Sequence, residues 1–104
     1  MNDKAEDAAR PFIPEDRTLL LVDDDAPFLT RLARAMESRG FEVTIANTVK
    51  DGKDLARAKK PAFAVVDLRL EDGNGLDVVA TIQETRPEAR IVVLTGYGNI
   101  ATAV

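Results

Sequence analysis

The chain has 104 residues, which favours a single domain with a small core. Its formal net charge of -4 argues against this segment binding nucleic acid, because a phosphate backbone needs a basic face. It contains neither Cys nor His, which excludes disulfides, thiolate or imidazole metal ligands and nucleophile–His pairs, and favours a cytoplasmic setting. No apolar run approaches the roughly 18 residues that span a membrane, so no membrane partner is expected.

The first half of the chain predicts a tail and then two strands that alternate with two helices. Residues 1–16 are polar, charged and broken by prolines, which predicts a flexible N-terminal tail. The apolar run 18–23 ends in acid and predicts a buried strand, followed by a helix over 25–40. A second strand is predicted over 41–46, and a weaker helix follows over 48–60.

The second half of the chain repeats the alternation. Residues 62–67 predict another buried strand that ends in acid, and 68–75 predict a loop. A helix is predicted over 76–86 and a fourth buried strand over 90–96. The last six residues, NIATAV, have the pattern of a helix beginning.

The whole order of elements predicts the fold class. Strands that alternate with helices form βαβ units, and these give an α/β fold with a doubly wound parallel sheet. We expect the domain to cover 17–104, with the strand order 2-1-3-4-5 and with helices on both faces. Because the chain stops at the predicted start of the fourth helix, we expect the fifth strand and fifth helix to be missing.

Acidic side chains follow two strands that should be neighbours. Asp23, Asp24 and Asp25 follow the first strand, and Asp67 ends the third. Since ligands of such sheets bind outside the carboxyl ends of the strands, where the strand order reverses, these acids should converge on one crevice. Clustered carboxylates repel, and Mg²⁺ offsets that repulsion well. Asp25 needs no such role, because it also fits as a helix cap.

The same crevice suits phosphoryl transfer. A carboxylate such as that of Asp67 can accept a phosphoryl group, and the transfer depends mostly on positioning and charge neutralisation. Thr95, at the end of the fourth strand, adds a hydroxyl beside the crevice. Gly96 leaves room for the phosphoryl group and offers a backbone N–H.

Three motifs together resemble the receiver domains of bacterial response regulators, which have the CheY-like fold. They are VDDD at 22–25, VVDLRLEDGNG at 65–75 and LTG at 94–96. Each stands at a predicted strand end, and the match runs from about Thr18 to the end of the chain. The segments VDLRLEDGNGLD and RIVVLTGYGNIATAV are especially similar to the RegA/PrrA/ActR group of redox-responsive regulators.

The resemblance implies a role for each matching residue. Asp67 matches the phosphoacceptor, Asp24 the direct Mg²⁺ ligand, and Asp23 the acid that holds the metal through water. Arg69 matches the position that gives its backbone carbonyl to the metal, and Thr95 matches the switch hydroxyl. The chain would then take a phosphoryl group from a sensor histidine kinase rather than act as an enzyme.

The resemblance also implies parts that lie past Val104. Receiver domains carry an essential Lys on a fifth strand, and DNA would be bound only through a C-terminal output domain. Without that strand, the run IVVLT at 91–95 becomes a sheet edge. Either the remaining parts follow in a longer chain, or a second copy completes the fold as a homodimer by edge pairing. Two alternatives remain: a receiver-shaped interaction module without phosphorylation, and a haloacid-dehalogenase-like phosphatase. The D-x-D at 23–25 favours the phosphatase, although Pro27 stands where that family carries Thr or Val.

Overall fold

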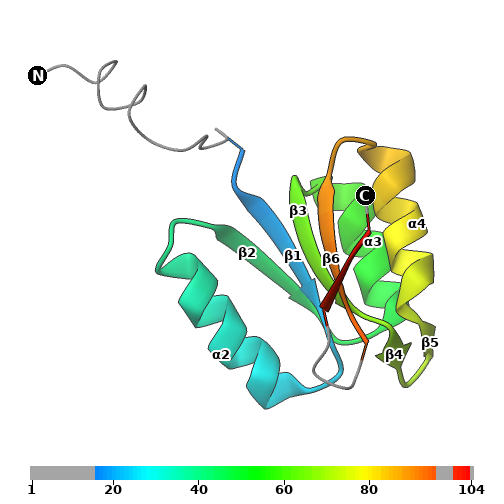
Figure 1. The fold of residues 1–104 in the computed structure, drawn as a ribbon, viewed down its shortest axis with the longest axis horizontal. Coiled ribbons are helices and arrows are strands. Elements are labelled where there is room, and N and C mark those ends of the chain that lie inside the picture. Colours follow the sequence, from blue (N-terminus) through cyan, green and yellow to red (C-terminus); the bar gives the residue numbers. More distant parts are fainter. Residues whose placement is uncertain (1–15, 96–99, 104) are drawn as a thin grey trace, which may run out of the picture.

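A computed structural model describes residues 16–95 and 100–103 and shows a twisted sheet with helices on both faces (Figure 1). The main sheet has the strand order β2-β1-β3-β6-β7, and a short second sheet pairs β4 with β5. In chain order the elements are β1 (Thr18–Val22), α2 (Ala26–Glu37), β2 (Glu42–Ala46), α3 (Val49–Lys59), β3 (Phe63–Asp67), β4 (Arg69–Leu70), β5 (Gly73–Asn74), α4 (Gly75–Thr85), β6 (Arg90–Leu94) and β7 (Ile100–Ala103).

The first four strands of the main sheet are parallel, as the sequence predicts. β1 lies between β2 and β3, so that Val22 is in register with both Ala46 and Val66. β6 pairs with the other side of β3 and brings Leu94 beside Asp67. The predicted order 2-1-3-4 is therefore confirmed, with β6 as the fourth predicted strand. The carboxyl ends of β1 and β3 meet at one edge of the sheet.

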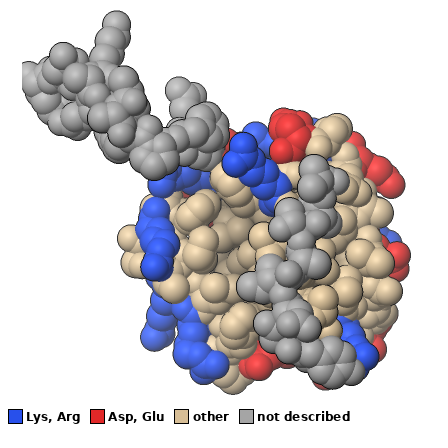
Figure 2. Space-filling view, viewed as in Figure 1, with Lys and Arg blue, Asp and Glu red and all other residues tan. Residues whose placement is uncertain are grey.

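Two apolar clusters hold the layers together. α3 and α4 cover one face of the sheet, where Leu20 belongs to the larger cluster, and α2 covers part of the other face, where Leu21 packs against Leu29 (Figure 1). Leu29 is the buried residue of α2, and Phe28 before it is half-buried. Figure 2 shows mostly uncharged atoms across the middle of the visible surface and charged side chains towards its rim.

Both ends of α3 are defined by recognisable capping residues. Thr48 caps α3, because its side chain accepts a hydrogen bond from the backbone N–H of Asp51 at 3.0 Å. The same helix ends at Lys59, and the cap residue Lys60, with a left-handed φ of 45°, stands directly before Pro61. Among the helices that the structure describes, none is long and apolar enough to cross a membrane.

The end of the chain corrects one prediction. Residues Ile100–Ala103 form the strand β7, antiparallel to β6, and not the start of a helix. An antiparallel return needs only a short connection, and the apolar β6 offers an unpaired row of backbone groups to the segment that follows it. β7 thus occupies the place expected for a missing fifth strand. The outer edge of β6 is thus paired with β7 among the described residues, and the homodimer stays a prediction.

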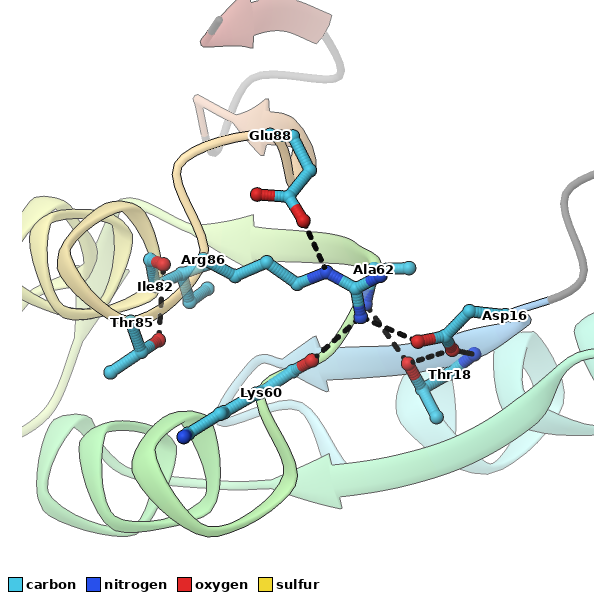
Figure 3. Close-up of polar contacts among 8 residues, drawn as sticks. All are labelled: Asp16, Thr18, Lys60, Ala62, Ile82, Thr85, Arg86 and Glu88. Carbon is cyan, nitrogen blue, oxygen red and sulfur yellow. Dashed lines mark hydrogen bonds and ion pairs between the residues drawn. The ribbon is translucent and has the colours of Figure 1, made fainter.

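A polar network fastens the opposite, amino-terminal end of the sheet (Figure 3). Asp16 accepts hydrogen bonds from the backbone N–H and the hydroxyl of Thr18, and it forms an ion pair with Arg86. Arg86 also donates to the carbonyl of Lys60 at 3.0 Å. The Thr18 hydroxyl and the Arg86 guanidinium lower the pKa of Asp16 to about 2. Asp16, the last residue of the predicted tail, is therefore anchored; residues 1–15 lie outside the described part of the chain.

Candidate functional site

The carboxyl ends of β1 and β3 place the predicted acids together. Asp23 directly follows β1, and its backbone N–H donates to the carbonyl of Ala46 at 3.2 Å, which continues the pairing with β2. Asp67 is the last residue of β3. Since Val22 and Val66 are in register, the chain positions that follow them lie side by side.

Three carboxylates converge at this point. Asp23, Asp24 and Asp67 each offer an oxygen, and these oxygens all lie within 4.8 Å of one another. Asp23 is buried, Asp67 is half-buried and Asp24 is exposed. The set therefore combines a buried wall with an open side. Oxygen donors in this arrangement suit a hard divalent cation such as Mg²⁺, which keeps several waters.

Asp23 carries the electrostatic cost of the cluster. Its side chain has lost most of its contact with water, since the residue is 7% exposed. Burial raises the pKa of its carboxyl, and the nearby carboxylates of Asp67, Asp24 and Asp25 raise it further. The backbone N–H of Asp25, which donates to Asp23 at 2.9 Å, acts in the opposite direction. A bound cation would offset the repulsion that this site contains.

The turn after β3 fixes the Asp67 carboxylate. The backbone N–H of Arg69 donates to an Asp67 side-chain oxygen at 3.1 Å. The N–H of Leu68 donates to the carbonyl of Leu94 at 3.0 Å, and the carbonyl of Leu68 accepts from Gly75 at 2.8 Å. At Gly75 a side chain would collide with the backbone carbonyl of Asp67, so only glycine permits this close approach.

The remaining predicted residues have different outcomes. Asp25 caps α2, as its carboxylate accepts from the N–H of Phe28 at 3.0 Å, so it is confirmed as a helix cap. Thr95 is half-buried and directly follows Leu94, the register partner of Asp67. Arg69 is exposed and lies in β4; the role predicted for its carbonyl stays a prediction. Gly96 lies outside the described residues.

One contact near the site was not predicted from the sequence. Asp72 belongs to the loop predicted over 68–75, and its carboxylate accepts hydrogen bonds from the backbone N–H groups of Val49 and Lys50. These two hydrogen bonds lower the pKa of Asp72, and the bond from Val49 has the larger effect. A carboxylate is favourable beside the free amides at the start of any helix. This preference does not indicate from the sequence which helix Asp72 contacts.

The parallel order of β2, β1, β3 and β6 and the acids at the switch point define a doubly wound α/β domain with three carboxylates gathered at the carboxyl ends of its strands. Comparison with known proteins then gives the family: a model of the response regulator receiver domain matches residues 19–104. The chain therefore belongs to the receiver domain family of two-component response regulators.

Individual relatives agree with this assignment. The photosynthetic apparatus regulatory protein RegA of Rhodobacter capsulatus is 71% identical over 89 residues, covering 86% of this chain and 48% of RegA. The acid tolerance regulatory protein ActR of Rhizobium meliloti (strain 1021) is 59% identical over 92 residues, covering 88% of this chain and 47% of ActR. The chain thus spans about half the length of these curated relatives. The resemblance to the RegA and ActR group is confirmed.

A solved structure shows the same fold. A response regulator protein from Burkholderia pseudomallei, crystallised with a phosphorylated aspartic acid, a calcium ion and citrate, superposes with a TM-score of 0.75. It is 40% identical, and the match covers 81% of this chain and 49% of that one. The CheY-like receiver fold is therefore confirmed.

Proposed function

We propose that Asp67 accepts a phosphoryl group from a partner histidine kinase, with Mg²⁺ bound by the neighbouring acids. The observation that carries the proposal is the convergence of the Asp23, Asp24 and Asp67 oxygens within 4.8 Å. The phosphorylated aspartic acid and calcium ion of the Burkholderia pseudomallei relative support it, because that protein shares the family and the fold.

In the proposed transfer, one Asp67 carboxylate oxygen attacks the phosphorus of a phosphohistidine. A P–O bond forms, the P–N bond to the donor breaks, and the bonding electron pair leaves with the imidazole. The N–H of Arg69 orients the attacking carboxylate from within the turn. Asp23 and Asp24, together with the carbonyl of Arg69, would hold Mg²⁺, which supplies positive charge against the carboxylates and the phosphoryl oxygens.

The readout is proposed to begin at Thr95. It follows the register partner of Asp67, so its hydroxyl is in a suitable place to respond to a new phosphoryl group. Repacking of this residue and of the segment after it would shift the population towards an active surface. The proposed output is transcription regulation through DNA binding by a domain outside these residues. We also propose a cytoplasmic location.

Beryllofluoride, which mimics a phosphoryl group, tests this proposal. We would follow amide NMR signals in this chain and in a version extended through the family's fifth strand, with and without Mg²⁺. The proposal predicts Mg²⁺-dependent shifts around Asp67 and Thr95 in the extended version. Their absence there would favour an interaction module that works without phosphorylation. Steady hydrolysis of a phosphate ester would instead favour the phosphatase.

A further inference from the structure

The loop after the proposed phosphoacceptor is a small hairpin. β4 pairs antiparallel with β5, with Arg69 opposite Asn74 and Leu70 opposite Gly73. Glu71 and Asp72 therefore form the two-residue tip of the hairpin.

The tip of this hairpin is joined to a helix that lies far away in the sequence. One Asp72 oxygen accepts from the backbone N–H of Val49 at 2.8 Å, and the other accepts from that of Lys50 at 3.2 Å. Both donors belong to the first turn of α3, where amides have no partner within the helix. The carboxylate is also favourable there because of the helix dipole.

The helix that Asp72 caps is itself held in place. Within α3, Gly52 is buried, and a Cβ added there would lie 3.0 Å from a methyl group of Val78 in α4, so the two helices are in close contact. Val49 and Leu70 are both buried in the larger core cluster. α3 therefore gives the hairpin a fixed support.

Asp67 and Asp72 are thus the two fixed ends of one short loop. At the first end, the N–H of Arg69 donates to the Asp67 carboxylate and the N–H of Leu68 is bonded to β6. At the second end, Asp72 is bonded to α3. Only four residues, 68–71, separate these two ends.

We propose that Asp72 is a positioning residue. By capping α3 from the tip of the hairpin, it holds the loop after Asp67 in the shape that the metal-binding acids require. The inference rests on the proposed function, because it presumes that Asp23, Asp24 and Asp67 bind Mg²⁺. Asp72 does not contact the metal in this account. It acts through Arg69 and Asp67, as outer-shell partners of metal ligands commonly do.

The test is a Mg²⁺ titration of this chain, followed by NMR, with three variants. Asp72→Ala removes both hydrogen bonds and should weaken Mg²⁺ binding about tenfold. Asp72→Asn removes the same charge but keeps one acceptor oxygen for the N–H of Val49, so it should restore most of the affinity. Thr48→Ala is the matched control: it removes a cap from the same helix without touching the loop, and it should leave the Mg²⁺ affinity near that of the wild type.

Each result decides something different. If Asp72→Ala binds Mg²⁺ as the wild type does, or if Thr48→Ala is equally weakened, the positioning role is wrong. If Asp72→Asn is as weak as Asp72→Ala, charge and not positioning explains the effect, which also overturns the inference. If the wild type binds no Mg²⁺ at all, the proposed function fails first, and the inference falls with it.

A measurement on the wild type covers the case in which Asp72→Ala does not fold. Coupling between two sites is reciprocal, so saturating Mg²⁺ should strengthen the contact between Asp72 and α3 by the same factor by which the contact strengthens Mg²⁺ binding. Hydrogen exchange at the amides of Val49 and Lys50 should therefore slow by up to about tenfold when Mg²⁺ is added. An unchanged exchange rate there, with Mg²⁺ bound, would overturn the inference.

Discussion

The substitution Asp23→Asn removes one negative charge from the cluster while keeping its shape. The amide oxygen can still accept from the N–H of Asp25, which donates to Asp23 at 2.9 Å. At 4.8 Å, the upper bound of the separation from Asp67, two unit charges repel by about 1 kcal/mol in water and about 3.5 kcal/mol at an effective dielectric constant near 20. Because Asp23 is buried and Asp67 half-buried, we expect the metal-free variant to gain at least about 1 kcal/mol of stability.

The assay is thermal unfolding at pH 7, followed by circular dichroism, in EDTA and in excess Mg²⁺. In EDTA the variant should unfold at a temperature at least about 4 °C above that of the wild type. Mg²⁺ at ten times its Kd should stabilise the wild type by about 1.4 kcal/mol and the variant much less. A variant that is equally or less stable than the wild type in EDTA would refute the account of the cluster.

The pH dependence has the matching sign. Since burial raises the pKa of folded Asp23, the folded state binds its proton more readily than the unfolded state does. The stability of the metal-free wild type should therefore fall as the pH rises from the ordinary value of 3.8 through the raised pKa. Asp23→Asn should lack this fall, which denaturant titrations across the range would measure.

Three further predictions concern the surroundings of the site. Gly75→Ala should cost about 1–3 kcal/mol and weaken Mg²⁺ binding, because its Cβ would meet the Asp67 carbonyl; urea midpoints equal to those of the wild type would contradict this. Asp25→Ala should cost about 1 kcal/mol in the same assay through the lost cap, and it should retain more Mg²⁺ affinity than Asp24→Ala; the reverse order would make Asp25 a ligand. Arg86→Ala should destabilise the protein at pH 7. Because the pKa of Asp16 is about 2 in the wild type, the difference in stability between the wild type and Arg86→Ala should be fully present above pH 3.8. It should narrow as the pH falls through about 2. A stability difference that does not change with pH would show that the ion pair does not cause it.

The parallel core and the acidic cluster were predictable from the sequence for a simple reason. Apolar runs that end in acid mark buried strands, and the βαβ connections restrict their order, so Asp23 and Asp67 had to meet. The capping roles of Asp25 and Thr48 were also predictable, because a cap depends on residues only three positions apart.

The other contacts depend on tertiary context. β7 is a strand because an unpaired edge of β6 lies close to it, and nothing within IATA itself distinguishes that outcome from a helix start. Asp72 reaches amides 22 and 23 positions away, and Arg86 reaches Asp16 across 70 positions. No local spacing encodes such partners. The Asp72 contact was therefore missed, although it lies next to the site.

The most direct test of the central claim is phosphorylation by acetyl phosphate, measured by intact mass on the version of the chain extended through the fifth strand. With Mg²⁺ the protein should gain one phosphoryl group, and it should gain none in EDTA or when Asp67→Asn replaces the acceptor. A phosphoryl group that still appears on the Asp67→Asn variant, or that appears equally without Mg²⁺, would contradict the account of Asp67 as the acceptor in a metal-dependent site.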